Sequence, residues 1–131
     1  RAALAVGAKR RMQSIEDRVT LFDDGQEILP GIVSVASHGH TPGHMSFEIR
    51  NGSDAAMVLG DAIGNHHVAF RKPEWLSGAD QEPETAVTTR QMLFDRITFD
   101  QMPVVGFHLP QGGFGRVDTS NNGYIFLPRE T

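Results

Sequence analysis

The six histidines of the chain are clustered rather than spread evenly. Three fall in one short loop, two are adjacent to each other, and the last precedes a Leu-Pro step. They are His38, His40, His44, His66, His67 and His108. Because the chain has no cysteine, a metal ion bound to it would take imidazole nitrogens and carboxylate oxygens as ligands.

The segment from Gly39 to His44, which reads GHTPGH, is the sharpest of these clusters. Pro42 and Gly43 are the residues that a type II turn takes at its two central positions, because proline presets φ and glycine accepts a positive φ. We therefore expect a tight turn that holds His40 and His44 in place. A turn whose imidazoles only cap backbone groups explains this hexapeptide equally well.

Two further residues have the same position relative to a predicted strand. Asp61 directly follows the predicted strand 55–60, and His108 directly follows the predicted strand 104–107. Ligand sites in α/β sheets collect at the carboxyl ends of strands, and Gly60 lets the backbone approach closely there. Taken singly, Asp61 suits a turn and His108 suits a core position. Together with His40 they predict a metal site.

Short β-prone stretches and two helices must position these loops. Six strands are predicted, at residues 19–22, 32–37, 45–50, 55–60, 104–107 and 123–127. Asn51-Gly52 predicts a hairpin between the third and the fourth of them. One helix is expected over residues 2–18, and a second, capped by Asp80 and with Pro83 in its first turn, is expected to reach about Asp100 and cover one sheet face. The fold class is therefore α/β or α+β.

Composition excludes some classes of partner. The chain has 131 residues and a net charge of −4, and its Lys and Arg residues are scattered, which argues against nucleic acid as a partner. The longest apolar runs, such as residues 55–59, are too short to cross a bilayer, so no membrane partner is expected. We expect a soluble protein, and the sequence leaves cytoplasm and periplasm equally open.

Over roughly residues 19–128 the chain resembles the metallo-β-lactamase-fold hydrolases. The loop containing His40 is similar to their GHTPGH segment, Gly60-Asp61 to their Gly-Asp segment, and the loop containing His108 to their last metal-binding loop. The resemblance is strongest to the branch that contains methyl parathion hydrolase and related lactonases. Acyl-homoserine lactonases typically have a tyrosine three residues after the Asp, where this chain has Gly64.

The resemblance implies a fold, an activity and a ligand set. The fold would be α/β, with residues 1–131 as a single partial domain, the C-terminal half of a four-layer αββα sandwich. The activity would be that of a dinuclear metal-dependent hydrolase, in which a metal-bound hydroxide attacks an ester, lactone or phosphotriester. His40, Asp61 and His108 would be metal ligands, with Asp61 bridging two zinc ions or other divalent metals. His38 and His44 are candidates for hydrogen bonds that orient His40, and a role in the surface turn suits them equally well.

The family also has an HxHxDH loop, for which this sequence offers no match. His38-Gly39-His40 begins like it, but Pro42 and Gly43 stand where its Asp and His would be. That loop belongs to the N-terminal half of the fold, and this chain begins with Arg1 rather than Met. We therefore expect the N-terminal half of the fold as a partner, with a homodimer as another way to cover the sheet.

Three other functions remain open at this stage. The same fold and ligand types suit a di-iron redox protein, although nothing here indicates the extra carboxylate or the flavin partner that it would prefer. A non-catalytic interaction module would use the histidine-rich loops only as turns. A nuclease of the same superfamily is disfavoured by the acidic charge. The pair His66-His67 is expected to be a solvated loop element whose imidazoles point apart on an extended chain.

Overall fold

The turn at Asn51-Gly52 joins two central strands of the sheet. The computed structural model describes residues 2–129. In it β3 (Met45–Asn51) and β4 (Asp54–Val58) pair antiparallel across this turn, where Gly52 has a φ of +61°. Glycine adopts a positive φ without steric cost, as this type of hairpin requires. The antiparallel pairing predicted from Asn51-Gly52 is confirmed.

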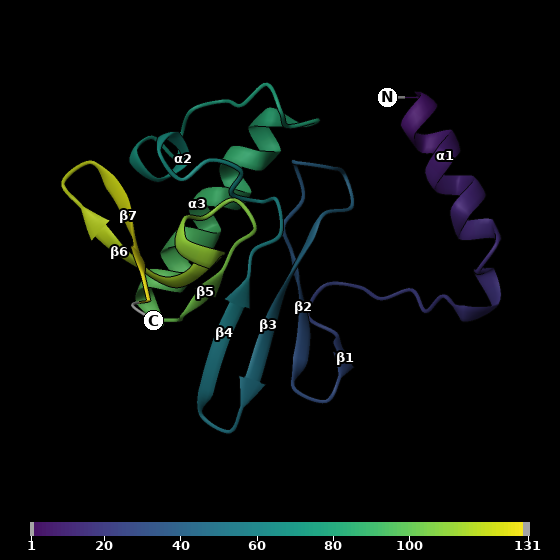
Figure 1. Ribbon diagram of the computed structural model, residues 1–131, viewed down its shortest axis with the longest axis horizontal. Coiled ribbons are helices and arrows are strands. Elements are labelled where there is room, and N and C mark those ends of the chain that lie inside the picture. The colour runs from purple at the N-terminus through teal and green to yellow at the C-terminus, as the bar shows by residue number, and fades with distance from the viewer. Residues whose placement is uncertain (1, 130–131) are drawn as a thin grey trace.

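Seven strands form one sheet whose spatial order follows the chain (Figure 1). The other five are β1 (Glu27–Leu29), β2 (Ile32–Ala36), β5 (Val104–Val105), β6 (Phe114–Ser120) and β7 (Gly123–Pro128). All neighbours are antiparallel except β4 and β5, which are parallel and need a crossover. That crossover contains α2 (Val68–Arg71) and α3 (Pro83–Phe99). Since β4 and β5 run in the same direction, the loops that follow them emerge at one edge of the sheet.

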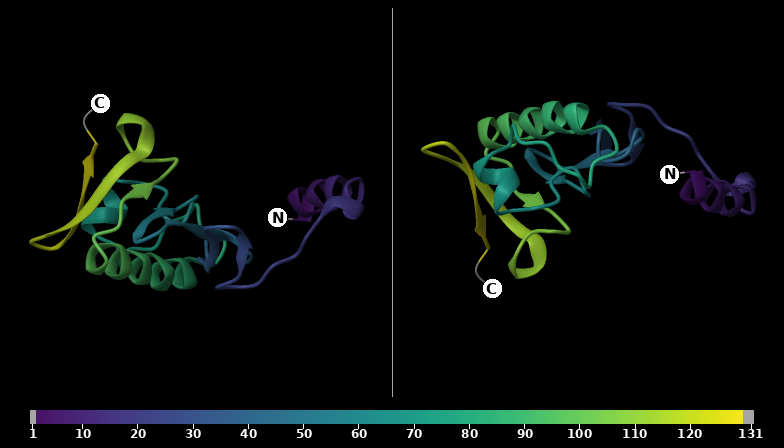
Figure 2. Two further views of the ribbon diagram at one scale, coloured as in Figure 1. Left: turned by 90° about the horizontal axis from the view of Figure 1, so that it is seen from below. Right: turned by 90° about the horizontal axis from the view of Figure 1, so that it is seen from above.

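Helix α3 packs along one face of the sheet (Figure 2) and forms the core with it. Leu93, Phe94 and Ile97 of α3 are fully buried, as are Met57 of β4 and Val104 of β5. The helix begins with Pro83 in its first turn and covers one sheet face, both as expected. Burial of this apolar surface fixes the position of the helix relative to the loops at the sheet edge.

The opposite face of the sheet remains partly exposed, and we call it the open face. In the register of the strands its side chains alternate with the buried ones, so Ile49 and Val105 lie on the face away from α3. The apolar members of the open face are Phe47, Ile49, Ala56, Val58, Val105, Phe114, Ile125 and Leu127. Four of them, Ile49, Val105, Ile125 and Leu127, are 38–48% exposed. Contiguous apolar surface of this kind usually marks an interface.

Several predicted elements differ from the structure. Residues 19–22 form no strand; Leu21 is exposed and the ring of Phe22 packs on Phe47, with centroids 6.0 Å apart. These residues have β propensity but no neighbouring strand to pair with, and propensity alone does not make a strand. The strands β1 and β6 are not predicted from the sequence, because β6 contains glycine, aspartate and serine, which favour turns.

The helix expected over residues 2–18 is shorter than predicted. It ends as α1 (Ala2–Gln13), and a single 3-10 turn, η1 (Glu16–Arg18), follows. The hydroxyl of Ser14 donates to the carbonyl of Arg11 at 2.7 Å, which gives the backbone an alternative to the next helical bond. Figures 1 and 2 show α1 apart from the sheet. Within residues 2–129 no helix has the length and apolarity needed to cross a membrane.

Candidate metal centre

The loop that carries His40 is held by the N-terminal end of α3 and the residues before it. The backbone N–H of Glu82 donates to the carbonyl of Gly39 at 2.9 Å, and that of Gln81 donates to the carbonyl of His40 at 3.1 Å. The hydroxyl of Thr89 donates to the carbonyl of His38 at 2.7 Å. Three successive carbonyls are therefore satisfied by one helix end, which fixes the backbone at His40.

Gly39 is the glycine of this loop that the fold requires. It has a φ of +125°, and a Cβ atom there would lie 2.3 Å from the backbone nitrogen of Ala86 in α3. The turn through Pro42 and Gly43 closes with a hydrogen bond of 3.1 Å from the N–H of His44 to the carbonyl of Thr41. However, Gly43 is not among the glycines with a positive φ, so the prediction of a type II turn is wrong. The positive φ falls at Gly39, where the loop approaches the helix.

The structure brings His40, Asp61 and His108 together at the edge of the sheet. One carboxylate oxygen of Asp61, Oδ1, lies 3.0 Å from Nε2 of His108. The other, Oδ2, lies 3.8 Å from Nε2 of His40. The two oxygens of one carboxylate thus face two different imidazoles, which come from loops 47 and 21 residues away in sequence. All three side chains are partly exposed, at 28–44%, so the cluster opens to its surroundings.

These separations suit ligands of a shared cation. Two ligand atoms on one tetrahedral zinc ion at usual bond lengths lie about 3.3 Å apart. The distances of 3.0 and 3.8 Å between Asp61 and the two imidazoles lie on either side of that value. Among residues 2–129, no group of three or more His, Cys, Asp or Glu side chains is arranged to hold a metal ion. The cluster therefore offers two pairs of ligand-type side chains that share Asp61.

His44 supports Asp61 and not His40, contrary to the role expected for it. Its Nε2 accepts the backbone N–H of Asp61 at 2.9 Å, so its proton must be on Nδ1, which lies 3.1 Å from the carbonyl of Ser37. Burial lowers the pKa of the His44 imidazole and favours this neutral form. Gly60 allows the contact, because a Cβ atom there would lie 2.7 Å from Nε2 of His44. The close backbone approach predicted at Gly60 is confirmed.

His38 contributes to the loop and makes no direct contact with His40. Its side chain is exposed, and its Nδ1 lies 3.1 Å from the carbonyl of His44. This hydrogen bond links the two ends of the GHTPGH loop. Both residues proposed to orient His40 therefore act on the backbone around the cluster.

The residue that contacts the second nitrogen of His40 is Asp80, which sequence reasoning assigned to a different role. Its Oδ1 lies 3.2 Å from Nδ1 of His40. The expected cap on α3 is not formed by Asp80, because the helix begins at Pro83 and no side chain caps its first turn. Asp80 lies 40 residues from His40 in sequence, and no local pattern indicates that the two meet.

His66 and His67 do not point apart as predicted. Their rings lie with centroids 3.7 Å apart, because the side chain of Asn65 accepts the N–H groups of His67 and Val68 and turns the chain into α2. In the part of the chain that the structure describes, no hydrogen bond or ion pair joins them to His40, Asp61 or His108. Their expected place outside the ligand cluster agrees with this arrangement.

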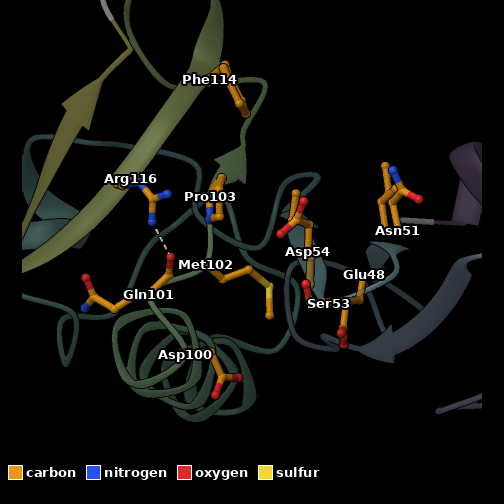
Figure 3. A pocket seen from close by; sticks show the side chains of 13 residues that line it. Glu48, Asn51, Ser53, Asp54, Asp100, Gln101, Met102, Pro103, Phe114 and Arg116 are labelled. Atoms are coloured by element: carbon orange, nitrogen blue, oxygen red, sulfur yellow. Dashed lines mark hydrogen bonds between the residues drawn. The ribbon is translucent and has the colours of Figure 1, made fainter.

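The hollow drawn in Figure 3 lies away from this cluster. It has a volume of about 830 Å³ and is shown in Figure 3, with Asp54, Asp100 and Arg116 among its lining residues. Arg116 there donates a hydrogen bond to the carbonyl of Gln101. None of His40, Asp61 and His108 lines it. The convergence of ligand-type side chains, rather than the size of a cavity, marks the candidate site.

Comparison with known proteins gives matches among solved structures alone. No family model matches the chain, and no curated protein sequence does. The structure is similar to AidC, a dizinc quorum-quenching lactonase, with a TM-score of 0.84 and 21% identity over 92% of this chain. It is similar to the hydrolase AbOPH of the β-lactamase superfamily, with a TM-score of 0.78 and 26% identity over 92% of this chain.

A probable metal-dependent hydrolase from Staphylococcus aureus is a third structural relative, with a TM-score of 0.61 and 22% identity over 88% of this chain. In each case the chain spans only 41–42% of the length of the other protein. The chain therefore has the α/β fold of the C-terminal half of a metallo-β-lactamase sandwich.

Proposed function

We propose that this chain supplies the C-terminal metal-binding loops of a dinuclear metal-dependent hydrolase. The observation that carries the proposal is the carboxylate of Asp61, whose two oxygens face Nε2 of His40 and Nε2 of His108 separately. A carboxylate arranged in this way suits a bridge between two cations. A side chain that only caps a turn would have no reason to contact two imidazoles.

Each ligand has a distinct task in this proposal. Two divalent ions, when bound, supply an activated water nucleophile and Lewis acids at neutral pH. Asp61 would hold both ions, His40 would contribute a nitrogen to one of them, and His108 would contribute a nitrogen to the other. His44 keeps the backbone of Asp61 in place through its 2.9 Å hydrogen bond. Zinc suits imidazole and carboxylate ligands, as do other divalent metals.

The remaining ligands are proposed to come from an N-terminal half with an HxHxDH loop. Two observations support this: each ligand pair around Asp61 is incomplete, and the open face exposes apolar side chains such as Ile49 and Leu127. A second sheet packed on the open face would bury these side chains and bring its own loops to the same edge. A second copy of this chain would cover the face without supplying the missing ligands.

Esters, lactones and phosphotriesters are the proposed substrates, as in the branch containing methyl parathion hydrolase and lactonases. AidC is itself a lactonase, which favours cyclic esters among these classes. The residues that line a pocket of about 320 Å³ follow Asp61 in the sequence. Three of them, Val68, Trp75 and Leu76, give the pocket an apolar wall. Such a wall suits the uncharged acyl or aryl part of an ester.

Metal content and hydrolysis together test this proposal. In the proposed full-length enzyme this chain would be joined to an N-terminal half with an HxHxDH loop, and that protein is the one to use. We expect two zinc ions per molecule and hydrolysis of at least one of a lactone, an aryl ester and a phosphotriester. Asp61→Asn, which removes the charge of the bridge, is expected to lower both metal content and turnover, by roughly 100-fold or more in turnover.

The matched control is Asp54→Asn, in the exposed hairpin end of β4. It removes the same charge far from the cluster and should leave metal content and turnover unchanged. A protein free of transition metal that gains no activity with added zinc would contradict the proposal and favour an interaction module. A coloured protein with two irons would contradict it in favour of a redox function.

A further inference from the structure

His40 lies between two carboxylates, one on each ring nitrogen. Its Nδ1 is 3.2 Å from Oδ1 of Asp80, and its Nε2 is 3.8 Å from Oδ2 of Asp61. The two carboxylates differ in environment, because the side chain of Asp80 is 8% exposed and that of Asp61 is 44% exposed. Asp80 is thus the buried partner of His40, on the side away from the ligand cluster.

A buried guanidinium forms an ion pair with Asp80. Nη1 of Arg90 lies 3.8 Å from Oδ2 of Asp80, and the Arg90 side chain is only 5% exposed. The same guanidinium donates to the carbonyls of Pro73 at 3.0 Å and Trp75 at 2.7 Å, so it is fixed against the loop before α3. Among the described residues, Oδ2 of Asp80 is the buried side-chain atom without a hydrogen-bond partner. This ion pair joins α3 to the segment before it, and Asp80 of that segment contacts His40.

The charge on Asp80 dictates which nitrogen of His40 carries the proton. An ionised carboxylate can only accept, so the hydrogen of neutral His40 must be on Nδ1. The lone pair on Nε2 then faces Oδ2 of Asp61, which is also an acceptor. Two acceptors that face each other at this distance repel unless a cation lies between them.

We propose that Asp80 is a positioning residue that fixes His40 in the tautomer with its Nε2 lone pair directed at the cation shared with Asp61. The proposal rests on the proposed function, because it assigns the metal to that same side of the ring. Carboxylates that hold a metal-binding histidine in this way raise its basicity and fix its ring orientation. Asp80 touches neither the cation nor the substrate in this arrangement.

The first test reads the tautomer and is independent of activity. Nitrogen NMR of the imidazoles, recorded on the full-length protein without metal at about pH 8, distinguishes a protonated Nδ1 from a protonated Nε2. We expect His40 to be protonated on Nδ1 in the wild type. Asp80→Ala should shift His40 toward the other tautomer, while His44, which is held by Ser37 and Asp61, should keep its own.

The second test reads zinc affinity by competition with a chelator. We expect Asp80→Ala to weaken zinc binding roughly 10–100-fold. Asp80→Asn preserves the shape of the side chain and an acceptor oxygen, so this variant should fold even if Asp80→Ala does not. Its zinc affinity should lie between those of the wild type and Asp80→Ala. The control is Asp95→Asn, which removes a carboxylate that accepts the 2.8 Å hydrogen bond of Tyr124 on the far part of α3. It should leave both readouts unchanged.

The results separate this role from the proposed function. A wild-type protein that binds no zinc contradicts the proposed function and, with it, the role of Asp80. A wild type that binds zinc while Asp80→Ala and Asp80→Asn bind it equally well contradicts the role of Asp80 alone. An unchanged His40 tautomer in both variants also overturns it.

Discussion

At the scale of single residues, the two glycines of the GHTPGH loop differ in whether the fold could accommodate a side chain at their positions. Gly39 has a φ of +125° and lies against the backbone of Ala86, whereas an added Cβ at Gly43 would meet nothing within 4 Å. From the sequence alone, turn chemistry predicts that Gly43 is the position that requires glycine. The fold instead needs glycine where the loop touches α3, because L side chains are strained at that φ.

We therefore predict opposite outcomes for two conservative substitutions. Gly39→Ala should lower the free energy of unfolding by about 3 kcal/mol or more, since both the backbone conformation and the contact with Ala86 resist a methyl group. Gly43→Ala should change it by less than about 0.5 kcal/mol. Urea unfolding followed by circular dichroism measures both. Equal losses in the two variants would contradict the role assigned to Gly39.

At the scale of secondary-structure elements, Glu48 ties β3 to α3. Its carboxylate accepts hydrogen bonds from Arg50 at 2.6 and 3.1 Å and also from Arg96 of α3. The hydrogen bond from Arg50, followed by the charge of Arg96, lowers the pKa of the Glu48 carboxyl below its ordinary value of 4.5. Glu48 is buried, whereas the side chains of Arg50 and Arg96 are 51% and 34% exposed, so the carboxylate meets them at the border of the core.

This lowered pKa gives a pH dependence with a definite sign. The unfolded chain binds more protons than the folded one between the two pKa values, so stability is full above pH 4.5 and is lost as the pH falls through the folded-state pKa. Glu48→Gln should cost about 1–3 kcal/mol at neutral pH. It should also flatten the decline of thermal stability on the acid side.

Thermal unfolding from about pH 7 down to about pH 3 tests this prediction. The exposed substitution Glu16→Gln, in the turn after α1, serves as the control and should follow the wild-type curve. If Glu48→Gln shows the same acid decline as the wild type, Glu48 is not the group that links α3 to β3 in a pH-dependent way.

At the scale of the whole molecule, the open face is the surface on which the proposed N-terminal half would pack. Ile49→Lys places a charge on this face, where the proposed N-terminal half would bury it, and Ile49 is already 44% exposed in the chain itself. We expect the substitution to weaken association of the chain with a separately produced N-terminal half by roughly tenfold or more. Calorimetric titration of one half with the other measures this change.

Phe99→Lys is the matched control, since Phe99 is 89% exposed at the end of α3, on the side of the sheet away from the open face. It removes a larger apolar side chain and should leave the association unchanged. Equal weakening by the two substitutions would mean that the halves do not meet through the open face.

The sequence predicts the parts of this molecule that depend on local chemistry. Asn51-Gly52 identifies a hairpin because Gly52 accepts the positive φ that the turn needs, and Pro83 marks the start of α3 because its missing N–H is not needed there. The convergence of His40, Asp61 and His108 is also predictable, since each follows the carboxyl end of a strand. Their role as ligands remains a prediction.

The parts that the sequence does not reveal depend on contacts between distant segments. β6 forms because β5 and β7 flank it, despite a composition that suits turns. Asp80 reaches His40 only because the loop before α3 is folded back by Arg90, 10 residues further along the chain. Residue propensities and sequence spacings carry no information about such contacts between distant segments. These contacts form only when the helix packs on the sheet.

The positioning of the loops that carry His40, Asp61 and His108 by the sheet and α3 has a thermodynamic consequence. When flexible side chains become ordered around an ion, they lose conformational entropy, and this loss opposes binding of the ion. Here most of that ordering is built into the folded chain through Gly39, Gly60 and the carbonyls fixed by α3. Association with a second half would then join two preorganised surfaces, and the ion would bind last, to residues of both halves.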